Sequence, residues 1–253
     1  MISSAWGVAW RVLKRAFTNP SFLLPPLMFP LIFFLGFAGG LSRVDQIPGF
    51  DYDPGYQTFQ FAFILLQFAA MSGVFTGFGI AQDFERGFAR RLLLAVEHRS
   101  SIILGYWLAT VIRWFFNMTI VFLIALLIGM NVQGNGLDLF GLIVLAVIVN
   151  IVGTLWAAGV ALRLRSQQAG PIMQLPIFLL IFLAPVFVPL GLLQGWVHAV
   201  ASVNPFTALL EAARSLLAGE TQGVALAFAI VVPLAGLFVL WALRGLRVAE
   251  RSA

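Results

Sequence analysis

Apolar runs of about 20 residues, separated by short polar connections, extend along the whole chain. The hydrocarbon core of a bilayer is about 30 Å thick, and about 20 helical residues cross it. A backbone in lipid has to satisfy its own hydrogen bonds, so each run predicts a transmembrane helix. The six predicted spans cover residues 22–41, 59–81, 108–130, 139–162, 172–193 and 224–243. The pattern therefore predicts an all-α integral membrane protein, with residues 1–253 in a single transmembrane domain.

The third apolar run is longer than one crossing requires, and it contains a charged residue. It extends from Ile102 to Met130, which is about 43 Å of helix. If the crossing occupies its second part, Arg113 lies at the cytoplasmic interface, where its long side chain reaches water. Three aromatic residues of the kind found at interfaces lie nearby: Tyr106, Trp107 and Trp114. We favour this interfacial position; the alternative is a buried arginine that lines a solute path.

The residues before the first span form an amphipathic pattern. Trp6, Trp10, Leu13 and Phe17 recur at i, i+4, i+7 and i+11, so they share one face of a helix. Three basic residues lie largely off that face: Arg11, Lys14 and Arg15. Residues 1–19 therefore predict an interface helix on the inner membrane surface, rather than an unstructured basic retention signal.

A charged segment, residues 83–99, follows the second span. Within it, Phe84, Phe88 and Leu92 recur at i, i+4 and i+8, which predicts a short cytoplasmic helix with an apolar face. Charges beside aromatic residues are typical of a docking surface for a soluble partner, although a solvated loop has a similar composition. The predicted docking residues are Asp83, Phe84, Glu85, Arg86, Gly87, Phe88, Arg90 and Arg91.

The connection between the fifth and sixth spans, residues 194–219, predicts two helices too short to cross a membrane. The second starts at Asn204-Pro205, where Asn caps a helix and Pro suits its first position. We interpret the two as re-entrant half-helices in the outer leaflet, because irregular backbone there has to be covered by protein or face water. Their marker residues are Trp196, Asn204, Pro205, Phe206, Glu211 and Arg214.

The distribution of charge predicts the orientation. Twelve of the 15 Lys and Arg residues fall before the first span or after the second, fourth and sixth spans. The positive-inside rule therefore places both termini in the cytoplasm. The basic excess is spread between apolar runs and forms no stripe, so we expect no nucleic-acid partner.

The composition excludes or disfavours several classes of protein. The chain is 61% hydrophobic and 10% charged, against about 25% charged in a soluble domain, which excludes a water-soluble globule. It has no Cys, and His98 and His198 fall on opposite sides of the predicted membrane, so no metal site is expected. The spans contain no Asp, Glu or His, which disfavours an ion-coupled secondary transporter. No H-E-x-x-H or G-x-S-x-G motif supports an intramembrane enzyme, the less favoured alternative.

The motif-bearing parts of the chain resemble the type-2 (ABC-2) permeases of ATP-binding-cassette transporters, particularly the daunorubicin-resistance-like bacterial drug and lipid exporters. These parts are Asp83-Phe84-Glu85-Arg86-Gly87, Arg91-Leu92-Leu93, Arg99, Leu104-Gly105, Asn204-Pro205-Phe206, Glu211-Ala212-Ala213-Arg214 and Gly219. The chain departs from the family pattern at Ala95-Val96-Glu97 and at Gly195-Trp196, where relatives have a Pro.

The resemblance implies a non-catalytic permease in the bacterial inner membrane that exports a hydrophobic or amphipathic substrate. It also implies a second permease half, the same or a paralogue, and two copies of a cytoplasmic ATPase. The sequence agrees with this division of labour, because its one Lys is Lys14 and no phosphate-binding G-x-x-x-x-G-K-[ST] loop exists. We therefore expect no cofactor in this chain, with ATP and Mg bound by the partner ATPase.

Polar residues inside the predicted spans are candidates for the substrate path, and membrane lipid is expected around the remaining apolar surface. Hydrogen bonds between helices are an equally good interpretation of these polar residues. The candidates are Gln67, Thr76, Asn117, Asn150, Thr154 and Gln174.

Overall fold

The structure, a computed structural model, describes residues 2–96 and 98–250; Glu97 of the predicted coupling segment lies outside them. The described residues are helical and contain no strand, so the all-α prediction is confirmed. The α-helices are α1 (Ile2–Thr18), α2 (Pro20–Gly40), α3 (Tyr56–Glu85), α4 (Phe88–Ala95), α5 (Ser100–Leu127), α6 (Gly136–Leu164), α7 (Gly170–Phe182), α8 (Gly195–Val203), α9 (Pro205–Leu217) and α10 (Val224–Glu250). Three short 3-10 helices, η1 (Ser42–Gln46), η2 (Gln167–Ala169) and η3 (Leu190–Leu192), lie in connections.

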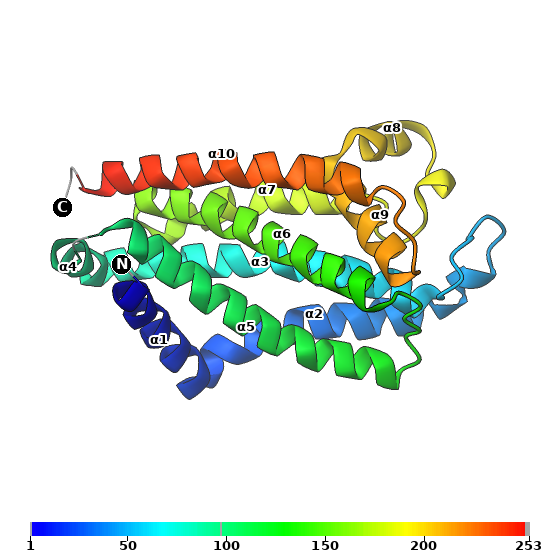
Figure 1. The fold of residues 1–253 in the computed structure, drawn as a ribbon, viewed down its shortest axis with the longest axis horizontal. Coiled ribbons are helices and arrows are strands. Elements are labelled where there is room, and N and C mark those ends of the chain that lie inside the picture. Colours follow the sequence, from blue (N-terminus) through cyan, green and yellow to red (C-terminus); the bar gives the residue numbers. More distant parts are fainter. Residues whose placement is uncertain (1, 97, 251–253) are drawn as a thin grey trace.

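The long helices form an elongated bundle with two distinct ends (Figure 1). The start of α1, the short α4 and the end of α10 lie together at one end, which we call the α4 end. The helices α8 and α9 lie at the opposite end, together with the connection between α2 and α3, and we call this the α9 end.

Five helices of the described chain are long and apolar enough to cross a membrane. They fall in α2 with the residues that follow it, α3, α5, α6 and α10. Of these, α3 is the most deeply buried and α10 the most exposed. The bundle is therefore built around α3, whereas α10 presents most of its apolar surface outward.

The closest packing in the bundle joins α3 to α6 through glycines. A Cβ atom on Gly73 would lie 2.2 Å from the backbone nitrogen of Thr154, and one on Gly153 would lie 2.3 Å from the carbonyl oxygen of Ala70. These two positions tolerate no side chain, because real Cβ atoms do not approach other atoms so closely. Small residues at such crossings allow helix backbones to touch in membranes.

The fifth predicted span differs most from the structure. The helix expected over residues 172–193 ends at Phe182, and α7 has 13 residues, or about 20 Å, less than the thickness of the hydrocarbon core. Pro185 and Pro189 follow and have no N–H to continue a helix. The backbone from Leu183 onward is irregular up to the short η3, so a continuous helix over the second half of 172–193 is a wrong prediction.

Polar side chains of neighbouring helices satisfy the carbonyl groups that this irregular segment leaves free. Arg214 of α9 donates to the carbonyl oxygens of Pro185 (2.9 Å) and Val186 (3.3 Å). Gln60 of α3 also donates to Val186, at 3.2 Å. The hydroxyl group of Tyr56 donates to the carbonyl oxygen of Phe187, at 3.2 Å. The broken backbone is therefore covered by protein, the condition under which membrane proteins tolerate it.

Candidate functional site: a polar cavity between α1, α3 and α5

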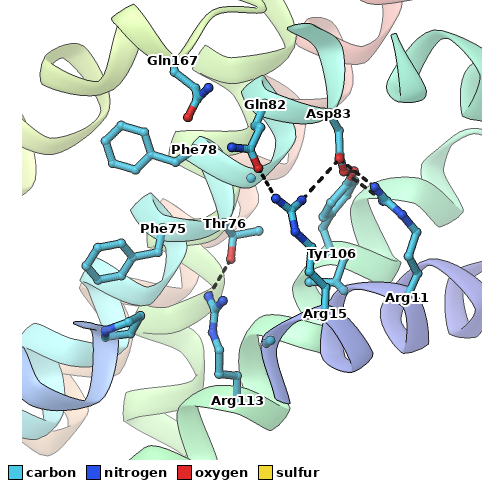
Figure 2. Close-up of a pocket in the computed structure, with 14 residues that line it drawn as sticks. Arg11, Arg15, Phe75, Thr76, Phe78, Gln82, Asp83, Tyr106, Arg113 and Gln167 are labelled. Atoms are coloured by element: carbon cyan, nitrogen blue, oxygen red, sulfur yellow. Dashed lines mark hydrogen bonds and ion pairs between the residues drawn. The ribbon is translucent and has the colours of Figure 1, made fainter. Parts of the chain in front are cut away.

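A cavity of about 290 Å³ opens between α1, α3 and α5. Its lining combines polar and apolar side chains, several of which are labelled in Figure 2. The polar lining residues are Arg11, Arg15, Thr76, Gln82, Asp83, Tyr106, Arg113 and Gln167. The apolar lining includes Val12, Ala16, Pro26, Phe75 and Phe78.

Asp83 connects three helices at one edge of this cavity. Its carboxylate accepts two hydrogen bonds from Arg11 of α1, at 2.7 and 2.9 Å, and one from the hydroxyl group of Tyr106 of α5, at 2.5 Å. Arg15 of α1 lies 3.9 Å away and also donates to Gln82. The Asp83 side chain is 4% exposed, and a buried carboxylate is stable only when paired and hydrogen-bonded in this way. Asp83 therefore holds α1 and α5 against the end of α3.

The two arginines of α1 respond differently to this environment. Burial by itself lowers the pKa of Arg11, but the hydrogen bonds and the negative charge of Asp83 outweigh burial, so the pKa lies above its ordinary value. Burial and the positive charge of Arg86 lower the pKa of Arg15. Both guanidinium groups stay charged at neutral pH, because the pKa of arginine starts so high.

Arg113 occupies the opposite side of the cavity, where its side chain is buried and does not reach out to water. Its residue is 9% exposed, and its Nη2 donates a long hydrogen bond of 3.5 Å to the hydroxyl group of Thr76. Nearby Tyr106 and Trp114, which we had assigned to an interfacial belt, are 4% and 1% exposed. The prediction that this side chain reaches water is wrong, because this face of α5 packs against α3. The alternative of a buried, cavity-lining arginine is the one observed.

A sequence signal for this arrangement exists. Tyr106, Thr110, Arg113 and Asn117 recur at i, i+4, i+7 and i+11, so they form one polar stripe along α5. All four are buried, and the Thr110 hydroxyl group lies 2.5 Å from that of Thr76. A polar stripe at helical spacing inside an apolar run predicts a face turned toward protein. The interfacial interpretation of Arg113 does not take this stripe into account.

The six residues predicted to line the substrate path have different surroundings in the structure. Thr76 lines the cavity, and the other five are not among its described lining residues. Asn150 donates to the hydroxyl group of Ser72, at 2.6 Å, and to the carbonyl oxygen of Ala69, at 3.2 Å, so it joins α6 to α3. Gln174 is half-exposed on α7.

The remaining path candidates, Gln67, Asn117 and Thr154, are fully buried. The amide atoms of Gln67 and Asn117 and the hydroxyl oxygen of Thr154 have no hydrogen-bond partner within the described chain. A buried polar group without a partner costs roughly 1–3 kcal/mol. These three side chains therefore have hydrogen-bonding capacity that the described residues do not use.

The predicted helix over the coupling segment is divided into two helices. The central helix α3 continues to Glu85, and α4 starts at Phe88 after Gly87, whose φ of 71° lies in the left-handed region that suits glycine. Phe84 and Phe88 therefore do not share a face, and this part of the prediction is wrong. Phe84 is 7% exposed, and Phe88 lies under the guanidinium group of Arg11, 3.5 Å from ring centre to carbon.

The remaining docking candidates lie around the turn between α3 and α4. Glu85, Arg86 and Arg91 are exposed, Gly87 is half-buried, and the side chain of Arg90 lies outside the described part of the structure. Glu85 accepts hydrogen bonds from the Ser166 hydroxyl group and from the backbone and side chain of Gln167. Within α4, Leu94 is an exposed apolar residue, at 76%, and it is not among the predicted docking residues.

Two short helices, α8 and α9, occupy the connection for which two short helices are predicted, at the other end of the bundle. Asn204 caps α9 by accepting from the Phe206 N–H (2.9 Å), and its side chain donates to the Leu180 carbonyl oxygen (2.7 Å). Arg214 pairs with Glu211 at 2.8 Å. Trp196 of α8 is 70% exposed, so it contributes little to this packing. Pro205 occupies the first position of α9.

Comparison with known proteins agrees with this architecture. The chain is 26% identical over 225 residues to a putative transport permease (ycf38) of Pyropia yezoensis, covering 85% of this chain and 74% of the relative. It is 24% identical over 222 residues to a daunorubicin resistance ABC transporter permease protein (DrrB1) of Streptomyces coeruleorubidus, covering 86% of this chain and 76% of the relative. Residues 4–218 match the family described as ABC-2 type transporter. The chain therefore belongs to the ABC-2 type transporter family, as a multi-pass membrane permease subunit that is not itself catalytic and works with a separate ATPase.

Proposed function

We propose that this subunit exports an amphipathic or hydrophobic molecule, which enters the cavity between α1, α3 and α5 from the cytoplasm or the inner leaflet. The observation that carries the proposal is the mixed lining of this cavity. Arginine, threonine and glutamine side chains face Phe75 and Phe78 across one space. Such a lining suits a molecule that has both a polar group and an apolar body.

The proposed orientation places the α4 end in the cytoplasm of a bacterial cell and the α9 end outside. Basic residues gather at the α4 end, where α1, α4 and the last turn of α10 lie together, and the positive-inside rule assigns such an end to the cytoplasm. Consistent with this assignment, α1 is an amphipathic helix that presents Trp6 and Trp10, 51% and 59% exposed, toward the surroundings.

We further propose that the ATPase docks on the surface formed by Glu85, Arg86, Arg91 and Leu94. An exposed apolar side chain within a charged rim is typical of a transient protein interface. A displacement of α4 by the ATPase is transmitted to the cavity through two contacts. Phe88 of α4 touches Arg11, and Arg11 is paired with Asp83. ATP and Mg are then bound by the partner, and nucleotide-driven movement shifts the packing of α1 and α5 against α3.

In this proposal the substrate leaves the cavity past Gln67, Asn117 and Thr154 toward the α9 end. Their unpaired polar atoms offer hydrogen bonds along a passage that is otherwise apolar. The irregular segment after α7 and the helices α8 and α9 form its outer boundary. A second permease half, the same or a paralogue, packs against part of the exposed apolar surface, lipid covers the rest, and each half takes one of two ATPase copies.

The proposed orientation is testable directly, because the chain contains no Cys. Single substitutions Leu94→Cys and Leu137→Cys place a thiol at each end, at positions 76% and 77% exposed. In intact cells, a membrane-impermeant maleimide should label position 137 and leave position 94 unlabelled. Labelling of position 94 from outside would reverse the orientation and reject the docking surface with it.

The transport function is tested with the ATPase that co-purifies with the subunit and is identified by mass spectrometry. Inside-out vesicles that contain both proteins should accumulate a fluorescent amphiphile when ATP is added. Vesicles with an ATPase that lacks its phosphate-loop lysine serve as the control. Equal accumulation in the control vesicles would contradict the proposal.

A further inference from the structure

Arg113 is a buried cation without an anionic partner in the described chain. Its residue is 9% exposed, and the ion pairs of the described residues involve other arginines. Its one hydrogen bond, to the neutral hydroxyl group of Thr76, is 3.5 Å long. Buried charges in proteins are normally paired, and a charge inside a membrane segment marks a functional site by default.

The rest of the cavity does not supply the missing negative charge. Its charged lining residues are Arg11, Arg15, Arg113 and the carboxylate of Asp83. That carboxylate is occupied, because it accepts both hydrogen bonds from Arg11 and one from Tyr106. The described lining residues therefore include no carboxylate that is free to pair with Arg113.

The wall beside Arg113 is apolar. Phe75, Phe78 and Pro26 line the same cavity, and the rings of both phenylalanines lie on the side of α3 that faces this space (Figure 2). A small inorganic anion leaves these surfaces without a partner, whereas an amphiphile places its charged group at Arg113 and its chain along them.

We infer that the cargo of this permease is an amphiphile with an anionic group, phosphate or carboxylate, and that Arg113 binds this group. The inference rests on the proposed function, since it names the substrate class of the same cavity. A cationic amphiphile places a like charge beside Arg113, and a neutral one leaves Arg113 uncompensated. Guanidinium suits phosphate and carboxylate because its planar donors form paired hydrogen bonds with both.

The test compares probes that share an acyl chain and differ in headgroup. Fluorescent lysophosphatidylglycerol and the monoacylglycerol with the same chain, which lacks the phosphate, are titrated onto the permease in nanodiscs, with inorganic phosphate as competitor. The anionic probe should bind at least about tenfold more tightly, as expected for a charge-assisted hydrogen bond. Arg113→Gln should remove this preference, Arg113→Lys should retain part of it, and Arg43→Gln, an exposed site at the other end, should leave it unchanged.

Several results would overturn the inference. They are equal affinity for the two probes, an unchanged preference in Arg113→Gln, or inorganic phosphate competing as well as the anionic lysolipid. Because Arg113→Lys keeps the charge, a folding defect in Arg113→Gln does not remove the test.

A transport experiment with the ATPase separates this inference from the proposed function. ATP-driven movement of the anionic probe supports both. Movement of amphiphiles without preference for the anionic one overturns the inference and leaves the proposed function standing. Binding that depends on Arg113 without movement of any amphiphile overturns the proposed function, and with it the assignment of the anion as cargo.

Discussion

The guanidinium carbon of Arg214 lies 3.3 Å from the centre of the Phe59 ring, so a charged group of α9 is stacked on an aromatic group of the central helix α3. Arg214 is 2% exposed, and it also donates to the carbonyl oxygens of Pro185 and Val186. One side chain thus joins α9, α3 and the irregular backbone that follows α7.

Replacing this side chain should destabilise the α9 end. Arg214→Met removes the donor to the Pro185 carbonyl oxygen and leaves that of Val186 with Gln60 alone. We expect a loss of about 2–4 kcal/mol, measured as a lower unfolding temperature of the purified subunit. Arg43→Met, at an exposed site of the same end, should change the stability by less than about 0.5 kcal/mol. Equal effects of the two substitutions would contradict the role of Arg214.

The close packing of α3 on α6 at Gly73 predicts that two glycine substitutions in α3 differ in their effect on stability. Gly73→Ala forces a Cβ atom into the backbone of Gly153 and Thr154 and should cost about 1–3 kcal/mol or prevent folding. Gly79→Ala on the same helix meets open space and should be neutral or stabilising by about 0.5–1 kcal/mol, because alanine favours helix. Thermal unfolding of both variants provides the comparison, and a stable Gly73→Ala protein would show that the two helices lie farther apart.

The ion pair between Arg11 and Asp83 should couple α1 to α3 energetically. In a double-mutant cycle with Arg11→Gln and Asp83→Asn, we expect a coupling energy of about 1–3 kcal/mol in the free energy of unfolding. The physical reason is the burial of Asp83, since its carboxylate is costly without its charged donors. Strictly additive effects would show that the two side chains act independently.

The proposed docking surface makes a further prediction. Leu94→Ser at the α4 end should weaken association with the ATPase by roughly tenfold, because an exposed apolar anchor is lost. Leu137→Ser, an equally exposed leucine at the α9 end, is the matched control and should leave association unchanged. The measurement is the amount of ATPase that co-purifies with each variant, and equal recovery from both would exclude Leu94 from the interface.

The long elements were predictable because their signal is local. A run of apolar residues is enough to predict a helix such as α6, and the cap at Asn135 with Asp138 marks where it starts. The amphipathic spacing before the first span likewise predicted a helix where α1 lies. Hydrophobicity did not reveal where the helix ends after Phe182, since the prolines that follow belong to an equally apolar sequence.

The cavity was less predictable because its residues come from distant parts of the chain. Asp83 and Arg11 are 72 positions apart, and nothing in either local sequence indicates that they pair. The charged appearance of residues 83–91 suggested exposure throughout, yet Asp83 and Phe84 face the protein interior. The polar stripe along α5 predicts that Arg113 faces protein, but it does not indicate that α3 is the helix opposite.

The contact of Gly73 with Gly153 and Thr154 limits where this permease can change shape. Backbones packed so closely cannot separate without losing the contact between the two helices. We therefore expect α3 and α6 to move together as a rigid pair. On the other side of α3, α5 is held partly through Asp83 and Thr76, whose hydrogen bonds can be exchanged for water or cargo. In the proposed mechanism, alternation between inward and outward access therefore occurs where α3 meets α5, which is also where Arg113 lies.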